Sequence, residues 1–177
     1  MILVICGTNR PESKSDIVSR HIVTTLKTKG QDVVYGDMKE IAPHLIHDGM
    51  YDAERLKPEL ITFQDECFTP ADKIVIVSPE YNGSYPGLLK LLIDCLSKRN
   101  YAKTFKGKKA LLVGVASGRA GNLRGMEHLT GFLNYLKINV FPNKLPISGI
   151  ESVLEADNLN EETSNVVDQL LEDFIKF

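Results

Sequence analysis

The stretch that decides the fold is "ILVICGTNRPESKSDIVSRHIVTTLKTKG", residues 2 to 30. Its first five residues form an unbroken apolar run, which is typical of a strand covered on both faces. A polar loop follows, and apolar residues then return at helical spacing, at Ile17, Val18, Ile22 and Leu26. Gly30 stands where glycine commonly ends a helix. The stretch therefore predicts a strand, a loop and a helix, in the order of a βαβ unit.

The rest of the chain repeats this alternation. Further strands are predicted over 32–36, 73–78, 110–117 and 138–142, and helices over 58–67, 86–97, 126–136 and 166–175. Alternating strands and helices with right-handed crossovers give a doubly wound α/β/α sandwich with about five parallel strands. No linker or repeat divides residues 1–177, so we expect a single domain. The least regular segment, 38–56, is expected to be a long surface loop.

Composition and charge narrow the function. The 21 basic and 23 acidic residues give a net charge of -2, which offers no bulk attraction to nucleic acid or to an anionic membrane. Cys6, Cys67 and Cys95 lack the spacing of a zinc site or a disulfide framework, so a reducing, cytoplasmic compartment is expected. The stretch "MILVICG" lacks the basic start and long apolar run of a signal peptide, so no leader is expected, and no stretch approaches the ~20 apolar residues that a membrane span needs.

Two other polar groups are expected to be inert. His44 and His47 are three residues apart, but no cysteine or acidic pair completes a metal site beside them. The run 98–109 holds six basic residues and no acidic one. It precedes the fourth strand, at the end of the sheet opposite a ligand crevice, so we expect a solvated face there.

Three polar loops follow predicted strands, and we expect them to converge. They are "GTNRPESKS" (7–15), "SPEYNGSYPG" (78–87) and "SGRAGNLRG" (117–125). In a doubly wound sheet, ligands bind at the carboxyl ends of the strands, where the strand order reverses. The sequence thus predicts one crevice lined by all three loops.

The first loop has the chemistry of a phosphate site. Thr8, Ser13 and Ser15 carry hydroxyls, Arg10 offers a planar cation, and the N–H groups of the next helix point at the same place. An ordinary capped helix is the alternative, because Ser13 and Asp16 resemble a capping box. The loop lacks the glycine spacing of dinucleotide folds and of nucleoside triphosphatases, so permanently bound NAD or hydrolysed ATP is not expected.

"GTNRPESKS" followed by "SPEYNGSYPGLLKLLIDCLS" resembles the NAD(P)H-dependent FMN reductase family, whose members include quinone, azo-dye and chromate reductases. The resemblance implies a flavodoxin-like fold with strand order 2-1-3-4-5, bound FMN, and NADPH or NADH as co-substrate. It assigns the FMN phosphate to Thr8, Arg10, Ser13 and Ser15, where position 8 is more usually serine. It also implies that the flavin ring and ribityl chain lie along Pro79, Glu80, Tyr81, Asn82, Gly83 and Ser84. Ser117 and Gly118 would complete the site, with Gly121 as a further candidate.

Two of these residues could have a structural role instead. Asn82 could donate to the ring atoms where charge builds on reduction, but Pro-x-x-Asn-Gly is also strong turn chemistry. Tyr81 could contact the ring, pack in the interior or lie at an interface.

The resemblance implies an FMN-dependent oxidoreductase, a flavoprotein in which the cofactor carries the chemistry and no side chain is catalytic. NAD(P)H would deliver a hydride and leave, and a small acceptor would take its place in a ping-pong cycle. That acceptor could be a quinone, an azo compound, free flavin or a metal oxyanion. Alternatives are a flavodoxin-type electron carrier, disfavoured by the near-neutral charge and the "PEYNGS" loop, and a flavin-free binding module.

The helix predicted over 86–97 bears on assembly. It is apolar on more than one side, at Leu88, Leu89, Leu91, Leu92, Ile93 and Leu96. One side can pack on the sheet, and the remainder suggests a subunit interface. The family resemblance likewise implies a homodimer or homotetramer in which the neighbouring chain partly roofs the flavin.

Overall fold

The computed structural model describes residues 1–177 and is built on one parallel sheet. Its strands lie in the order β2-β1-β3-β4-β5, with β6 also paired to β4. This order confirms the predicted flavodoxin-like fold. The strands are β1 (Ile2–Cys6), β2 (Val33–Asp37), β3 (Lys73–Pro79), β4 (Lys109–Val115), β5 (Asn139–Val140) and β6 (Leu145–Ile147).

The fifth position of the sheet is divided. The sequence predicts one strand over 138–142, but β5 pairs with the start of β4 and β6 pairs with its end. Pro142 lies in the gap between the two pieces. Because proline has no N–H to donate to a neighbouring strand, an interruption at this position is expected.

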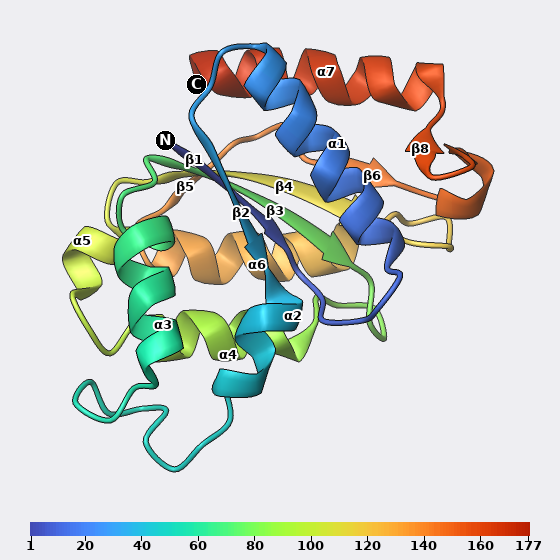
Figure 1. Ribbon diagram of the computed structural model, residues 1–177. Coiled ribbons are helices and arrows are strands. Elements are labelled where there is room, and N and C mark those ends of the chain that lie inside the picture. The colour runs from blue at the N-terminus through green and yellow to red at the C-terminus, as the bar shows by residue number, and fades with distance from the viewer.

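Helices cover both faces of the sheet (Figure 1). Helices α1 (Lys14–Thr28) and α7 (Glu161–Lys176) lie on one face, and α3 (Pro58–Phe63), α4 (Gly87–Leu96) and α6 (Leu123–Tyr135) lie on the other. The shorter elements are α2 (Met38–Ile41), α5 (Tyr101–Phe105), β7 (Leu154–Glu155), β8 (Asn158–Leu159), the 3-10 turns Ala42–His44 and Ile150–Ser152, and a π-helical turn, Gln64–Phe68. No helix combines the length and apolar character needed to cross a membrane.

Alternation along the strands sends side chains to two separate cores. In β1, Leu3 and Ile5 join the core beneath α3, α4 and α6, whereas Ile2 and Val4 join the core beneath α1 and α7. All five residues of β1 are buried, which explains why its sequence is uninterrupted by polar residues. Gly30 has a φ of 73° and follows α1 as a left-handed terminator, as predicted.

The prediction of a long surface loop over 38–56 is wrong in part. The segment begins with α2 and a 3-10 turn, and it contributes five buried side chains to the core under α3 and α4: Met38, Ile41, Leu45, Met50 and Leu56. Sequence periodicity missed them because they are spaced irregularly and separated by polar residues.

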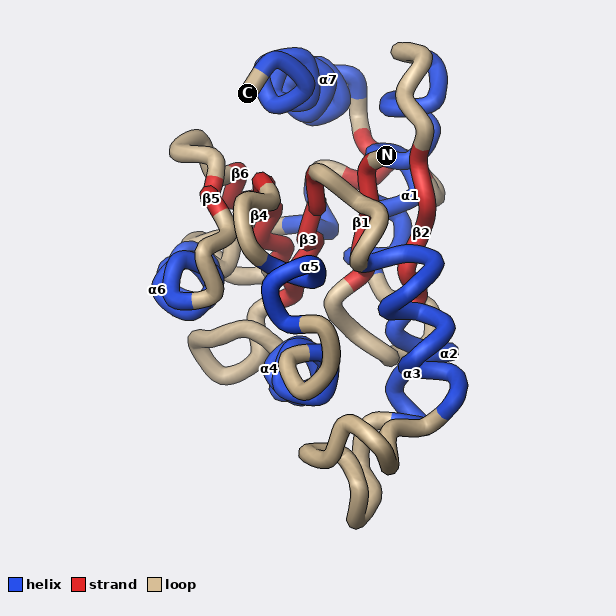
Figure 2. The backbone as a smooth tube through the Cα atoms, turned by 90° about the vertical axis from the view of Figure 1, so that its left-hand side faces the viewer, coloured by secondary structure: helices blue, strands red, loops and turns tan.

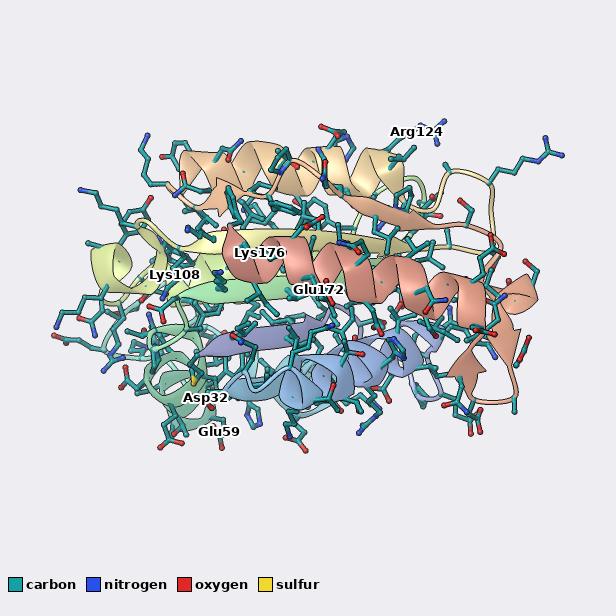
Figure 3. The ribbon with its side chains drawn as sticks, turned by 90° about the horizontal axis from the view of Figure 1, so that it is seen from above. Asp32, Glu59, Lys108, Arg124, Glu172 and Lys176 are labelled. Carbon is teal, nitrogen blue, oxygen red and sulfur yellow. The ribbon has the colours of Figure 1, made fainter.

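The basic run 98–109 is largely the expected solvated face, since Lys98, Lys103 and Lys106 are exposed, but it has one exception. Lys108 is buried, and its ammonium group donates hydrogen bonds to the carbonyl oxygens of Thr69 and Ala71. Burial lowers the pKa of Lys108. The basic run lies at the end of the sheet opposite the polar loops, as predicted. Figure 3 shows Lys108 toward one end of the sheet and Arg124, in the third loop, toward the other.

The carboxyl ends of the three central strands reach the same edge of the sheet. Cys6 is in register with Val77, and Pro79 is in register with Val115. The three polar loops therefore leave the sheet side by side, although they are distant in sequence. Figure 2 shows β1, β3 and β4 as neighbours in the middle of the sheet.

Candidate functional site

A crevice of about 210 Å³ opens where the three loops meet. Eight of the twelve expected site residues line it: Thr8, Arg10, Ser13, Ser15, Pro79, Glu80, Tyr81 and Ser117. The other four, Asn82, Gly83, Ser84 and Gly118, lie in the same loops but outside the crevice lining. The fold thus brings most of the expected residues around one space.

The first loop ends at the N-terminus of α1, with Ser13 as the N-cap. The Ser13 hydroxyl oxygen accepts a hydrogen bond from the Asp16 N–H at 3.3 Å. Its own O–H remains available to a ligand, so the cap and the ligand role are compatible. The first-turn N–H groups of α1 lack partners within the helix and favour a bound anion.

Asp16 completes only half of a capping box, because its carboxylate is engaged elsewhere. It accepts hydrogen bonds from Tyr35 of β2 and from Arg20, and it lies 3.6 Å from the Lys39 ammonium. Burial acts to raise the pKa of Asp16, but these hydrogen bonds and charges outweigh it and hold the pKa below its ordinary value. Asp16 therefore ties the start of α1 to the edge of the sheet.

Thr8 and Tyr81 join the first and second loops. Their hydroxyl oxygens are 2.6 Å apart, and the Thr8 hydroxyl also accepts the Arg10 N–H at 3.2 Å. If Tyr81 donates, Thr8 accepts twice and keeps its proton for a ligand. This contact with the first loop means that Tyr81 directs its hydroxyl toward the expected phosphate position.

The second loop turns back in a two-residue hairpin. Tyr81 and Ser84 exchange backbone hydrogen bonds of 2.8 and 3.1 Å, and the central residues Asn82 and Gly83 have φ values of 51° and 76°. Two positive φ values in a two-residue loop are characteristic of a type I′ turn, for which Asn-Gly is the preferred pair. Asn82 therefore does serve the turn, and its exposed side chain leaves a ligand role open as well.

The third loop packs against the second by way of the start of α6. The side-chain amide of buried Asn122 donates to Ser78 and Pro79 at the end of β3. On the next turns of α6, His128 Nδ1 lies 2.9 Å from the Ser84 hydroxyl. The resemblance assigned no role to Asn122, which the structure shows to be a link between two loops.

A fourth segment completes the lining. Ile150 and Glu151 follow β6, and Glu151 accepts a hydrogen bond of 2.9 Å from the Ser117 hydroxyl. Sequence reasoning missed this segment because β6 was not predicted as a strand. It also missed four residues next to predicted ones: Glu12, Lys14, Val115 and Ala116.

The cations of the crevice come from one segment. Arg10 and Lys14 belong to the first loop and the start of α1, which also carry the carboxylate of Glu12, whereas the carboxylates of Glu80 and Glu151 come from other segments. With two cations and three carboxylates, the lining has a formal charge of -1. Anion binding must therefore rely on the local cations, hydroxyls and N–H groups of the first loop.

Comparisons with known proteins show the family of this chain. The model of the NADPH-dependent FMN reductase family matches residues 1–151. The chain belongs to this family. A quinone reductase of Escherichia coli strain K12 is 30% identical over 168 residues, which cover 95% of this chain and 85% of that protein.

A second relative and a solved structure are also similar to this chain. An NADPH azoreductase of Bacillus sp. strain OY1-2 is 25% identical over 149 residues, covering 84% of this chain and 77% of the azoreductase. The structure of FerB, a flavoenzyme NAD(P)H:(acceptor) oxidoreductase from Paracoccus denitrificans, matches with a TM-score of 0.81 at 21% identity, covering 99% of this chain and 94% of FerB. That structural match supports the flavodoxin-like fold.

The residues present fit the phosphate end of FMN. The crevice offers hydroxyls, a helix N-terminus and two cations, which is the donor set that a phosphate requires. Its volume of about 210 Å³ is below the ~300–1,000 Å³ usual for enclosed small-molecule sites. A ligand as large as FMN would therefore extend out of the crevice.

Proposed function

We propose that this member of the FMN reductase family binds one FMN per chain, with the phosphate in the crevice and the ring along the second loop. The observation that carries the proposal is the convergence of hydroxyls, two cations and the α1 N-terminus at the carboxyl ends of β1, β3 and β4. When bound, FMN would supply the ability to take a hydride from NAD(P)H and give it to a second substrate.

The residues of the chain would bind and orient. Arg10 would pair with the phosphate, and the free protons of Thr8 and Ser13 would donate to its oxygens. The hairpin centred on Asn82 and Gly83 would bring backbone close to the ring. No side chain is assigned a bond-making step, so we propose no catalytic residue.

We also propose the class of acceptor and the order of events. Quinone and azo reductases among the relatives favour a small, flat organic acceptor. Free flavin and metal oxyanions remain further candidates. Because the flavin would stand open to solvent on one side, NAD(P)H and the acceptor would use the same face in turn, giving ping-pong kinetics.

A homodimer, alone or within a tetramer, is the assembly that we propose. Its support is the incomplete enclosure of an FMN-sized ligand by one chain, since a neighbouring chain could cover part of the exposed ring and leave one side open to substrates. Most of α4 is unavailable for the interface, because Leu89, Leu92, Ile93 and Leu96 are buried within the chain. Of the six apolar residues expected to need cover, only Leu88 and Leu91 are half-buried.

A ligand comparison tests the crevice directly. We expect FMN to bind about 10- to 100-fold more tightly than riboflavin, because riboflavin lacks the phosphate and its charge-assisted hydrogen bonds, each worth ~1.5–3 kcal/mol. Quenching of flavin fluorescence on titration with protein gives both affinities. Inorganic phosphate should compete with FMN and not with riboflavin. Equal affinities for the two flavins would contradict the proposed phosphate site.

A further inference from the structure

Asn122 is the most completely buried amide side chain at the edge of the crevice. It has no exposed surface, and it caps α6 with a left-handed φ of 63°. Its side chain forms no capping bond to the helix that it begins. The side-chain amide is directed instead to the end of β3.

The contacts of Asn122 concentrate on one stretch of backbone. Its Nδ2 group lies 3.0 Å from the Ser78 carbonyl oxygen, 3.1 Å from the Ser78 hydroxyl and 2.9 Å from the Pro79 carbonyl oxygen. Its Oδ1 atom is buried and has no hydrogen-bond partner. An unpaired buried acceptor is unfavourable, so the energetic value of this side chain lies in its two donor protons.

These bonds fix the peptide between Pro79 and Glu80, where the second loop leaves β3. The Pro79 carbonyl oxygen accepts from Asn122, and the Glu80 N–H at the other end of the same peptide donates to the Val115 carbonyl oxygen at 3.0 Å. With both polar groups held, the peptide plane cannot rotate. Pro79, Glu80 and Tyr81 line the crevice, so the orientation of this peptide sets the course of the loop beside it.

Two glycines let the third loop approach this closely. A Cβ atom on Gly125 would lie 2.1 Å from Asn122 Oδ1 and 2.8 Å from the backbone carbon of Ser84. A Cβ atom on Gly114 would lie 2.1 Å from the Gly121 carbonyl oxygen. The start of α6 is therefore in backbone contact with both the fourth strand and the hairpin of the second loop.

We infer that Asn122 is a positioning residue for the flavin ring, acting through the Pro79–Glu80 peptide without touching the ligand. The inference rests on the proposed FMN site. In that site the first loop would bind the phosphate and so determine affinity. The second loop would set the surroundings of the ring and so determine its spectrum and reactivity. Loss of Asn122 should change the spectrum, reduction potential and reduction rate of bound FMN much more than its affinity.

Two substitutions test the inference. Asn122→Gly removes the amide while keeping a residue suited to positive φ. Asn122→Asp keeps the shape and replaces both donor protons by an acceptor facing three oxygen atoms. For each, we expect the rate of flavin reduction by NADPH at saturating FMN to fall about tenfold, because small displacements of the reacting groups can cost up to ~100-fold in rate. Asn134→Asp, an exposed change on α6, is the matched control and should behave as wild type.

The outcomes separate the two proposals. If wild-type protein binds no FMN, the proposed function fails before any variant is made. If wild type binds and is reduced, and both folded variants keep its flavin spectrum, midpoint potential and reduction rate while only their melting temperature falls, Asn122 is merely structural and the inference is overturned.

A measurement on the wild-type protein covers the case in which neither variant folds. The side-chain NH₂ signals of Asn122 in a nitrogen-resolved NMR spectrum should exchange slowly with solvent and should shift when FMN in the site is reduced. Rapid exchange, or signals that do not respond to reduction, would overturn the inference.

Discussion

At the scale of single residues, Arg10 offers the sharpest test of the first loop. Arg10→Ala should lower the affinity for FMN by roughly 10- to 100-fold, because it removes charge-assisted hydrogen bonds of ~1.5–3 kcal/mol each. Riboflavin affinity should not change, and turnover at saturating FMN should stay near that of wild type. Flavin fluorescence titrations and steady-state rates measure these quantities. Normal FMN binding by this variant would show that the first loop holds a different ligand.

Alanine is not a suitable substitution at Asn82, because this residue has a φ of 51° in the hairpin. Alanine would add backbone strain of roughly 1–2 kcal/mol there, whereas glycine accepts the conformation freely. If the side chain donates to the ring, Asn82→Gly should slow reduction of bound flavin with little change in FMN affinity. Stopped-flow absorbance checks the rate. A wild-type rate in Asn82→Gly would mean that Asn82 serves the turn alone.

At the scale of secondary-structure elements, Asp16 links α1 to β2 and gives that contact a pH dependence. Its pKa is lowered in the folded protein, so its stabilising contribution is present above the unfolded pKa of about 3.9 and disappears as pH falls through the lower folded value. Asp16→Asn should therefore reduce the free energy of unfolding at neutral pH, and its difference from wild type should shrink below about pH 4.

Urea unfolding at a series of pH values measures this difference. Asp157→Asn, which changes an exposed aspartate in the turn between β7 and β8, is the control and should show no such trend. A difference between Asp16→Asn and wild type that is the same at acid and neutral pH would contradict the role of the Asp16 carboxylate.

Some secondary-structure elements could be predicted from the sequence, and others could not. The central strands were predictable because burial on both faces leaves unbroken apolar runs, and the loops after them follow from the topology of the sheet. Gln64 shows the limit. It occupies a π-helical turn and is fully buried, and its amide donates to the carbonyl oxygens of Leu96 and Arg99. Nothing in the local sequence distinguishes it from a surface glutamine, because its partners lie 32 and 35 residues further along the chain, at the end of α4 and just beyond it.

The residues of the candidate site were likewise only partly predictable from the sequence. Thr8, Arg10 and Ser13 were accessible to sequence reasoning because they lie in the first loop, directly after a strong strand. Glu151 was not, because the segment that carries it reaches the crevice only through β6, a three-residue strand. Asn122 was hidden for a further reason, since a buried asparagine and a turn asparagine look alike until their hydrogen-bond partners are known.

At the scale of the whole molecule, the proposed dimer predicts a difference between the two faces of the sheet. Leu91→Glu, at a half-buried position on α4, should shift the mass in solution toward that of one chain and weaken retention of FMN. Val166→Glu makes the same kind of change on α7, which covers the opposite face, and should leave the mass unaltered. Light scattering measures the mass of each variant in solution. A wild-type protein of single-chain mass would end the dimer proposal.

The measurement that tests the central claim most directly is the visible absorbance of the FMN complex, recorded without oxygen before and after NADPH is added. We expect about one FMN bound per chain, loss of the flavin absorbance as NADPH is mixed in, and its return when a quinone is added. Bound FMN that NADPH and NADH both leave unreduced would contradict the reductase and favour an electron carrier. A protein that takes up no FMN would contradict the site itself.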